Sequence, residues 1–431
     1  MLFHFASYLD AEGQIRQGDL RIRNAVIEEI GPALRIEPDE EIINCEGKLI
    51  LPAFYNTHTH LPMTLLRGYG ENLSLLDWLE HKVFPFEDLL TVEDVYWGTL
   101  LAIAELLASG CCSASDMYFR LPGIIQAVQE TGFKINLVNP ITGNKPYREM
   151  PGFDEELYLL ETAESDASGR IRIDAGIHAE YTSGPEAVRS VVAFAEEYDL
   201  AIHLHLSESR AEHEACKQRW QKTPLRYFYD LAVFSRPVLA AHAIYLEDSD
   251  YDLLRELVAA GHEITLMHNP HSNLKLASGF APLHRWRETG VNITVATDGA
   301  ASNNALNILG ELRLAGVLQK AVSGDPCFLT PQELLAMVTT NGARAQRRER
   351  AGRLAPGCAA DLAILDIDKP HFYPQENLLN HLVYSAQGSD VWMTVVDGKI
   401  LYRDGQFMSL DIAEVQRQVE RIYQEKMAQL Q

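Results

Sequence analysis

The stretch "KLILPAFYNTHTHLP", residues 48–62, decides the fold, because an apolar run ends there in two histidines one residue apart. A doubly wound open sheet usually carries a glycine-rich phosphate turn after its first strand, and "NTHTHLP" stands in that place. Residues i and i+2 of a strand share a face, so His58 and His60 are placed to point the same way. The stretch therefore predicts a strand that ends in a polar pair.

Runs of apolar and β-branched residues recur along the next 240 residues or so, and most are followed by a helical pattern. Examples of that pattern are 91–110, with Thr91 as N-cap, 183–198, with Pro185 near its start, and 247–262. Eight buried strands that alternate with helices favour a parallel (β/α)8 TIM barrel, with a doubly wound sheet as the second choice. The predicted strands are 51–58, 111–117, 134–140, 173–181, 201–208, 238–245, 263–270 and 292–299.

The two ends of the chain have a different pattern. Residues 1–50 and 346–410 alternate apolar and polar positions over short stretches, and the Asp-Gly pairs at 397–398 and 404–405 are hairpin turn signals. We expect antiparallel strands from both ends to form one small β-sandwich beside the barrel of residues 51–345. Residues 411–431 predict a final helix that opens with a capping box from Asp411 to Glu414.

Composition excludes several classes of partner. The 431 residues are 47% hydrophobic and carry a net charge of −23, so no basic surface is expected to bind nucleic acid. The densest basic run, 344–353, is expected to be a solvated loop. The six cysteines form no C-x-x-C pair, and no signal peptide or membrane-spanning run is evident. We therefore expect a cytoplasmic protein with free cysteines that does not bind membranes.

Polar residues gather where the predicted strands end. Each one alone is more often structural, as a hydrogen-bonded histidine or a turn aspartate. In a parallel barrel these ends meet at one rim, and imidazole and carboxylate groups suit a divalent ion such as Zn²⁺, which lowers the pKa of bound water to about 7. Glu208 and His242 then remain to manage protons. The strand-end residues are His58, His60, His178, His205, Glu208, His242, His268 and Asp298.

Five motifs together resemble the amidohydrolase superfamily, in its deaminase and chlorohydrolase branch. The resemblance is greatest to the group of 5-methylthioadenosine/S-adenosylhomocysteine deaminases, and it runs nearly end to end, including "LAPGCAADLAILD" at 354–366. The motifs are "NTHTHLPMTLLRG" at 56–68, "HLHLSES" at 203–209, "AAHAIYL" at 240–246, "NPHSNLKLASG" at 269–279 and "TDGAASNNALN" at 297–307.

This resemblance implies one divalent metal ion, expected to be Zn²⁺. It implies that Glu208 and His242 handle protons, that Asp298 takes part in proton transfer, and that His178 contacts the substrate base. His203 is expected to lie one layer deeper than the ligands. The implied metal ligands are His58, His60, His205 and Asp298.

The resemblance also extends over residues 61–90, a long connection after the first ligands. Glu87 matches a position that contacts ribose hydroxyls in nucleoside deaminases. Trp78, Phe84 and Phe86 either form an apolar lid or pack beneath the loop. Farther along the chain, Arg148 is the candidate to bind a substrate carboxylate, with Lys145 as the second choice.

The implied reaction is hydrolytic deamination of an adenine nucleoside to its inosine analogue and ammonia. The expected substrates are 5′-methylthioadenosine, S-adenosylhomocysteine or adenosine, and the family implies a homo-oligomer, either a dimer or a tetramer. One alternative is a free-base aminopurine or pterin deaminase, or an s-triazine hydrolase, that uses the same metal site. Another is a barrel without catalytic activity that serves in binding or assembly.

Overall fold

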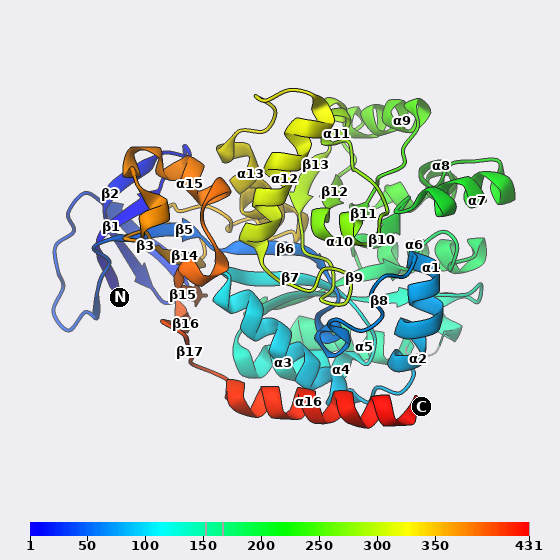
Figure 1. The fold of residues 1–431 in the computed structure, drawn as a ribbon, viewed down its shortest axis with the longest axis horizontal. Coiled ribbons are helices and arrows are strands. Elements are labelled where there is room, and N and C mark those ends of the chain that lie inside the picture. Colours follow the sequence, from blue (N-terminus) through cyan, green and yellow to red (C-terminus); the bar gives the residue numbers. More distant parts are fainter. Residues whose placement is uncertain (151–152, 166–167, 431) are drawn as a thin grey trace.

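The computed structural model describes residues 1–150, 153–165 and 168–430, and its centre is a barrel of eight parallel strands (Figure 1). Neighbouring strands follow one another in chain order from the first to the last. This confirms the predicted parallel barrel. The strands are β6 (Phe54–Thr59), β7 (Cys111–Met117), β8 (Lys134–Ile141), β9 (Ile171–Ile177), β10 (Ile202–Leu206), β11 (Val238–His242), β12 (Ile264–His268) and β13 (Asn292–Val295).

The first and last barrel strands are joined by side-chain hydrogen bonds. The hydroxyl oxygens of Thr57 and Thr294 lie 2.7 Å apart. At the carboxyl end of β6, the backbone N–H of Asp298 donates a hydrogen bond to the carbonyl of His58 at 3.0 Å. The residues that follow β13 are therefore held directly against the His58 end of β6.

Helices cover the outside of the barrel, as the βα alternation predicts. The predicted helix at 91–110 begins with Thr91, whose side chain and that of Asp94 form a capping box. Pro185 is the first residue of its helix, where its missing N–H costs nothing. The helices are α3 (Val92–Ala108), α4 (Leu121–Thr131), α5 (Phe153–Ser165), α6 (Pro185–Glu197), α7 (Arg210–Trp220), α8 (Pro224–Asp230), α9 (Asp248–Ala259), α10 (Pro270–Lys275), α11 (Leu283–Thr289), α12 (Ile308–Ser323), α13 (Pro331–Val338) and α14 (Thr340–Ala345).

Both chain ends form a second, nine-stranded sheet, which confirms the prediction that they come together. Its β5 strand shows the two-sided packing, because Leu49 and Leu51 join the large core while Ile50 joins a separate cluster of the sheet. The strands are β1 (Leu2–Leu9), β2 (Ile15–Arg23), β3 (Val26–Gly31), β4 (Ile42–Asn44), β5 (Lys48–Pro52), β14 (Leu362–Asp366), β15 (Val391–Val396), β16 (Lys399–Arg403) and β17 (Gln406–Phe407).

One detail of this sheet matches the prediction and one differs from it. The hairpin turns at Asp397-Gly398 and Asp404-Gly405 are present, and all four residues have positive φ. However, β4 and β5 pair with β1 in parallel, so the N-terminal part is not wholly antiparallel. The chain makes a long excursion between β3 and β5, and that length lets it return in the direction of β1.

The chain leaves the second sheet at Pro52, where β5 ends, and enters the barrel at Phe54, where β6 begins. One apolar run covers both strands, so the predicted strand at 51–58 merged the end of β5 with β6. The predicted division at residues 50/51 falls inside β5. At the other boundary α14 ends at Ala345, and β14 begins at Leu362.

The basic run 344–353 is not simply a solvated loop. Arg348 is buried and donates to the backbone carbonyls of Ile135, Gly169 and Arg170 at the amino ends of β8 and β9. The prediction of a solvated loop is therefore wrong for this residue. A guanidinium carries five donors, which suits it to satisfy several carbonyls at the bottom of a barrel.

The chain ends in helix α16 (Ile412–Gln429), which lies along α3 (Figure 1, red). The Asp411 side chain accepts from the backbone N–H groups of Ala413 and Glu414, which confirms Asp411 as the N-cap, but the Glu414 side chain bonds to Gln418 and Arg417, so the reciprocal half of the predicted capping box is not formed. A short helix, α15 (Leu378–Tyr384), precedes it in the chain. None of the described helices combines the length and apolar character that a bilayer crossing requires.

Candidate metal and substrate site

A cavity of about 860 Å³ opens at the carboxyl ends of the barrel strands. Its base carries six of the residues expected at the rim, and its outer wall comes from the connection between β6 and α3. Cavities of this size enclose small molecules of nucleoside dimensions. The predicted rim residues that line it are His60, His178, His205, Glu208, His242 and Asp298.

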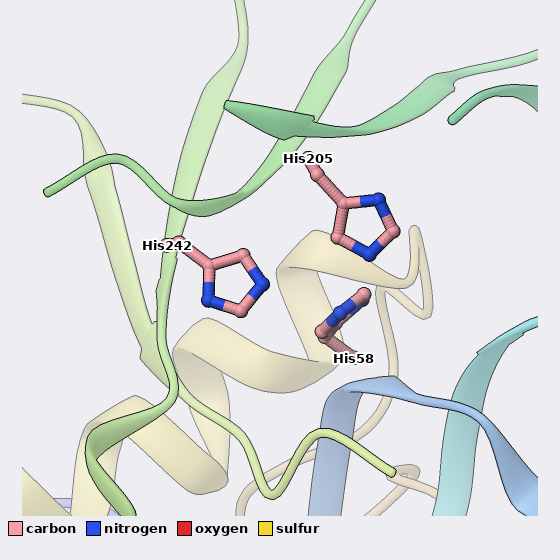
Figure 2. A group of neighbouring side chains, drawn as sticks. All are labelled: His58, His205 and His242. Atoms are coloured by element: carbon pink, nitrogen blue, oxygen red, sulfur yellow. The ribbon is translucent and has the colours of Figure 1, made fainter. Parts of the chain in front are cut away.

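Side chains from three strands face one another at this base (Figure 2). One ring nitrogen each from His58, His205 and His242 lies within 4.8 Å of the others, and the same holds for His58, His60 and the Asp298 carboxylate. Asp298 Oδ1 is 3.7 Å from His58 Nε2 and 3.4 Å from His60 Nε2. The structure thus brings together all four predicted metal ligands.

The other ring nitrogens have partners that orient the rings. His60 Nδ1 lies 2.6 Å from the Met117 carbonyl, and His205 Nδ1 lies 2.8 Å from the His178 carbonyl. A carbonyl only accepts, so each Nδ1 carries the hydrogen and each Nε2 keeps a free lone pair. Second partners of this kind typically fix the tautomer of a metal-ligating histidine.

His58 gives the test of whether a metal ion fits. Its Nδ1 is 2.9 Å from Nε2 of His203, which lies deeper in the barrel as expected. Its Nε2 is buried and has no hydrogen-bond partner among the described residues. A buried polar atom without a partner costs free energy, and a cation at the centre of the cluster would satisfy it. The donor set of imidazoles and one carboxylate suits a divalent ion.

Asp298 is held by its local backbone and by two hydrogen bonds. It has φ 63° just after β13, a conformation that short polar residues tolerate. Its Oδ1 accepts from the Gly299 N–H at 2.7 Å, and its Oδ2 accepts from the Ser272 hydroxyl at 2.5 Å. These contacts aim the carboxylate at His58 and His60.

Burial sets the charge state of the histidines. Burial and neighbouring histidines hold the pKa of His58 and His205 well below the ordinary value. Burial also lowers the pKa of His178 to about 4. These rings are therefore neutral at pH 7, which is the form that binds metal ions.

Glu208 and His242 form a separate pair at the cavity base. His242 Nε2 lies 3.8 Å from Glu208 Oε2, and His242 Nδ1 is 2.8 Å from Asn273 Oδ1. Burial raises the pKa of Glu208. Burial opposes the charged form of His242, but Glu208 and Asp298 raise its pKa on balance. A carboxyl and an imidazole with raised pKa values side by side are suited to proton transfer near neutral pH.

The connection after β6 forms the outer wall of the cavity. It contains a 3₁₀ helix (Leu61–Leu66), α1 (Leu75–Trp78), a π-helical turn (Leu79–Val83) and α2 (Phe84–Glu87). Trp78 and Phe84 line the cavity, whereas Phe86 is fully buried and packs beneath the connection. The lid and packing alternatives thus each hold for part of this aromatic set.

Glu87 also lines the cavity. Its side chain is buried, and its Oε1 has no hydrogen-bond partner among the described residues. Burial raises the pKa of Glu87 to about 8. Oε1 itself has almost no accessible surface and the Tyr118 hydroxyl interacts with the carboxyl group, so Glu87 is a buried polar group beside Tyr118 on the cavity wall.

Three predicted residues lie elsewhere. Arg148 is exposed and bonds to Glu197 at 2.6 Å, outside the cavity lining, and Lys145 is also exposed and absent from it. Among the described residues that line the cavity, Arg120 is the one with a guanidinium or ammonium group. His268 is buried below the rim and does not reach the cavity. Sequence position alone did not reveal that Arg148 would lie on the surface and pair with an acidic residue of α6.

Sequence reasoning missed several residues that contact the site. Ser272 and Asn273 orient Asp298 and His242, and both belong to the "NPHSN" motif, which was a usable signal. Tyr118 and Tyr181 line the cavity, but they follow strands in which no pattern distinguished them.

Comparisons with known proteins agree with this geometry. Residues 49–401 match the model of the Amidohydrolase family. A 5-methylthioadenosine/S-adenosylhomocysteine deaminase from Dictyoglomus thermophilum is 40% identical over 401 residues, 92% of each chain.

Two solved structures are similar in fold. An adenosine deaminase from Xanthomonas campestris with bound zinc has a TM-score of 0.90 and 27% identity over 99% of this chain and 98% of its own. Atrazine chlorohydrolase from Arthrobacter aurescens, complexed with zinc, has a TM-score of 0.86 at 21% identity over 98% and 99% of the two chains. The second likeness shows the fold alone.

Proposed function

This chain belongs to the amidohydrolase family. From that membership we propose that it catalyses the hydrolytic deamination of an adenine nucleoside, in which water replaces the amino group and ammonia is released. The observation that carries the proposal is the arrangement of one cavity. The buried His58 Nε2, which has no hydrogen-bond partner among the described residues, lies 3.7 Å from Asp298 Oδ1 at its base, and Glu87 lines its wall. Nucleoside deamination needs a metal centre at the base and a contact for the sugar at the wall.

We propose that His58, His60, His205 and Asp298 hold one divalent ion, with zinc the expected metal. A bound divalent ion supplies Lewis-acid activation of the attacking water. The neutral histidines and the fixed Nδ1 hydrogens support this ligand set. The bound zinc in the adenosine deaminase structure supports the choice of metal.

Glu208 and His242 are the proposed proton carriers. Glu208 delivers a proton to N1 of the purine ring and then to the leaving amine. His242 accepts or steers the proton of the attacking water and stabilises developing charge, and Asp298 also takes part in this transfer. The 3.8 Å separation of Glu208 and His242 and the raised pKa of each support these roles. His178 is proposed to contact the base near N3.

Glu87 is the proposed contact of the ribose hydroxyls, and Trp78 is the proposed apolar wall beside the substrate. A ribose hydroxyl would bond to the carboxyl group of Glu87, which lines the cavity beside Tyr118. In contrast, we do not propose Arg148 or Lys145 as carboxylate ligands, because neither lines the cavity.

An ammonia-release screen tests the function. Zinc-loaded protein is offered adenosine, 5′-methylthioadenosine, S-adenosylhomocysteine, guanine, pterins and s-triazines, and we expect release from the adenine nucleosides. Release from guanine, pterins or triazines alone would favour the free-base or triazine alternative. Release from none of these compounds, by a protein that holds no transition metal as purified and gains no activity from added zinc, would favour the non-catalytic barrel.

The Glu87→Ala variant sharpens the choice among substrates. If Glu87 binds ribose, the variant loses activity toward nucleosides and keeps its rate with free bases. Equal losses on both classes would contradict the ribose contact.

Cellular location and assembly stay proposals. The six cysteines are unpaired in the structure, which supports a reducing compartment such as the cytoplasm. A dimer or tetramer is a prediction from the family resemblance, and light scattering of the purified protein tests it.

A further inference from the structure

The last helix of the chain contacts the segment that forms the wall of the cavity. Helix α16 follows the second sheet in the chain, yet it packs against α3 and against the 3₁₀ helix Leu61–Leu66 of the barrel (Figure 1). In Figure 1 its carboxyl end lies below α2, the helix that ends at Glu87. A segment remote in sequence therefore lies close to the proposed nucleoside contact.

An aromatic cluster makes this contact. The ring of Tyr423 on α16 lies 6.2 Å from that of Phe86 and 6.4 Å from that of Tyr69, and Phe86 and Tyr69 are 5.9 Å apart. Such spacings are in the range of favourable aromatic pairs. Phe86 is fully buried and immediately precedes Glu87, which lines the cavity. The Tyr423 ring thus packs against Phe86, the residue that precedes Glu87.

Helix α16 is itself held firmly. Lys426 Nζ lies 2.8 Å from Asp94 Oδ2, and both side chains are nearly buried. The same Asp94 oxygen accepts the backbone N–H of Thr91, so one carboxylate caps α3 and pairs with α16. Ile422, one residue before Tyr423, is fully buried. A fixed support on one side of Phe86 limits the positions that Glu87 is able to take.

We propose that Tyr423 is a positioning residue of the substrate site, acting through Phe86 to hold Glu87 in place for a nucleoside. This inference rests on the proposed function for its consequence in substrate specificity. Its structural part, the support of residues 75–88 by α16, does not depend on the substrate. Tyr423 touches no reacting atom, so its effect falls on substrate binding.

Three variants test the inference in the full-length, zinc-loaded protein. Tyr423→Ala removes the ring, Tyr423→Phe keeps it, and Gln424→Ala changes the exposed neighbour on the same helix. We expect Tyr423→Ala to raise KM for adenosine or 5′-methylthioadenosine by about three- to tenfold, the factor for loss of an aromatic pair, with kcat little changed. The other two variants should match the wild type.

Amide hydrogen exchange gives a readout that needs no activity. Tyr423→Ala should speed exchange in residues 75–88 while the barrel strands and the zinc content stay as in the wild type. Unchanged exchange in that segment, or a lower kcat at unchanged KM, would overturn the proposal, because a merely destabilised protein loses active molecules without altering KM. Absence of nucleoside turnover in the wild type would refute the proposed function, and the exchange result would still decide the support by Tyr423.

Discussion

Glu208 is the residue whose substitution most directly tests the chemistry. Glu208→Gln keeps the size of the side chain but replaces the titratable carboxyl group by an amide that is neither an acid nor a base near pH 7, so kcat should fall by at least about 100-fold. Glu208 is not among the proposed metal ligands, so the zinc content should be unchanged. Ammonia release and metal analysis on the same preparation measure both quantities. A rate near that of the wild type would show that Glu208 is not the proton carrier.

The buried Glu87 makes stability depend on pH. Burial raises its pKa to about 8 in the folded protein, well above the value near 4.3 of an unfolded chain. At a pH between these two values, Glu87 is protonated in the folded protein and ionised in the unfolded chain. The free energy of unfolding therefore falls as pH rises, by up to about 1.4 kcal/mol per pH unit. The Glu87→Gln variant does not lose stability in this way, because glutamine does not titrate in this pH range.

The difference in melting temperature between Glu87→Gln and the wild type, measured without substrate, should therefore grow in favour of the variant from pH 5 to pH 8. A constant difference over this range would mean that Glu87 titrates at its ordinary pKa when folded.

At the scale of elements, the crossing of α3 and α4 depends on a glycine. A Cβ at Gly123 of α4 would lie 2.3 Å from the backbone oxygen of Val92 on α3, and backbone atoms have little room to shift. Gly123→Ala should cost about 1–3 kcal/mol through overpacking, more than the helix propensity that alanine adds. Urea unfolding measures this change.

Gly310→Ala is the matched control, since Gly310 lies at the same early position of α12 and a Cβ there meets no atom closer than 3.6 Å. This variant should be neutral or slightly stabilising. Equal effects of the two substitutions would show that the α3–α4 contact is able to relax.

At the scale of the whole molecule, a buried ionic group joins the barrel to the second sheet. Lys134 Nζ at the start of β8 lies 2.7 Å from carboxylate oxygens of Asp361 and of Asp397, which flank β14 and β15. Burial opposes ionisation of Asp361, but Lys134 and its hydrogen bonds hold its pKa below the ordinary value. The Asp361 contribution to stability is therefore present above that ordinary value and is lost as pH falls through the folded pKa.

Lys134→Met should destabilise the protein by about 3–5 kcal/mol, because Asp361 stays buried without its partner. The double variant Lys134→Met with Asp361→Asn should recover part of this loss, since the more deeply buried of the two unpaired carboxylates is gone and Asp397 still lies 3.7 Å from Arg170. Urea unfolding at pH 7 of both variants measures the difference. If the double variant is as unstable as the single one, the cost lies in packing.

The sequence alone determined the barrel, the joined chain ends and the metal-site candidates, because these depend on short-range patterns. Strand periodicity places His58 and His60 on one face, and parallel strands bring their carboxyl ends to one rim. The positions of residues that depend on long-range contacts were decided only by the tertiary structure. Arg148 pairs with Glu197 on the surface outside the cavity, Arg348 is buried at the bottom of the barrel, and Tyr423 of α16 packs against Phe86. Such pairings join residues far apart in the chain, and local patterns carry no record of them.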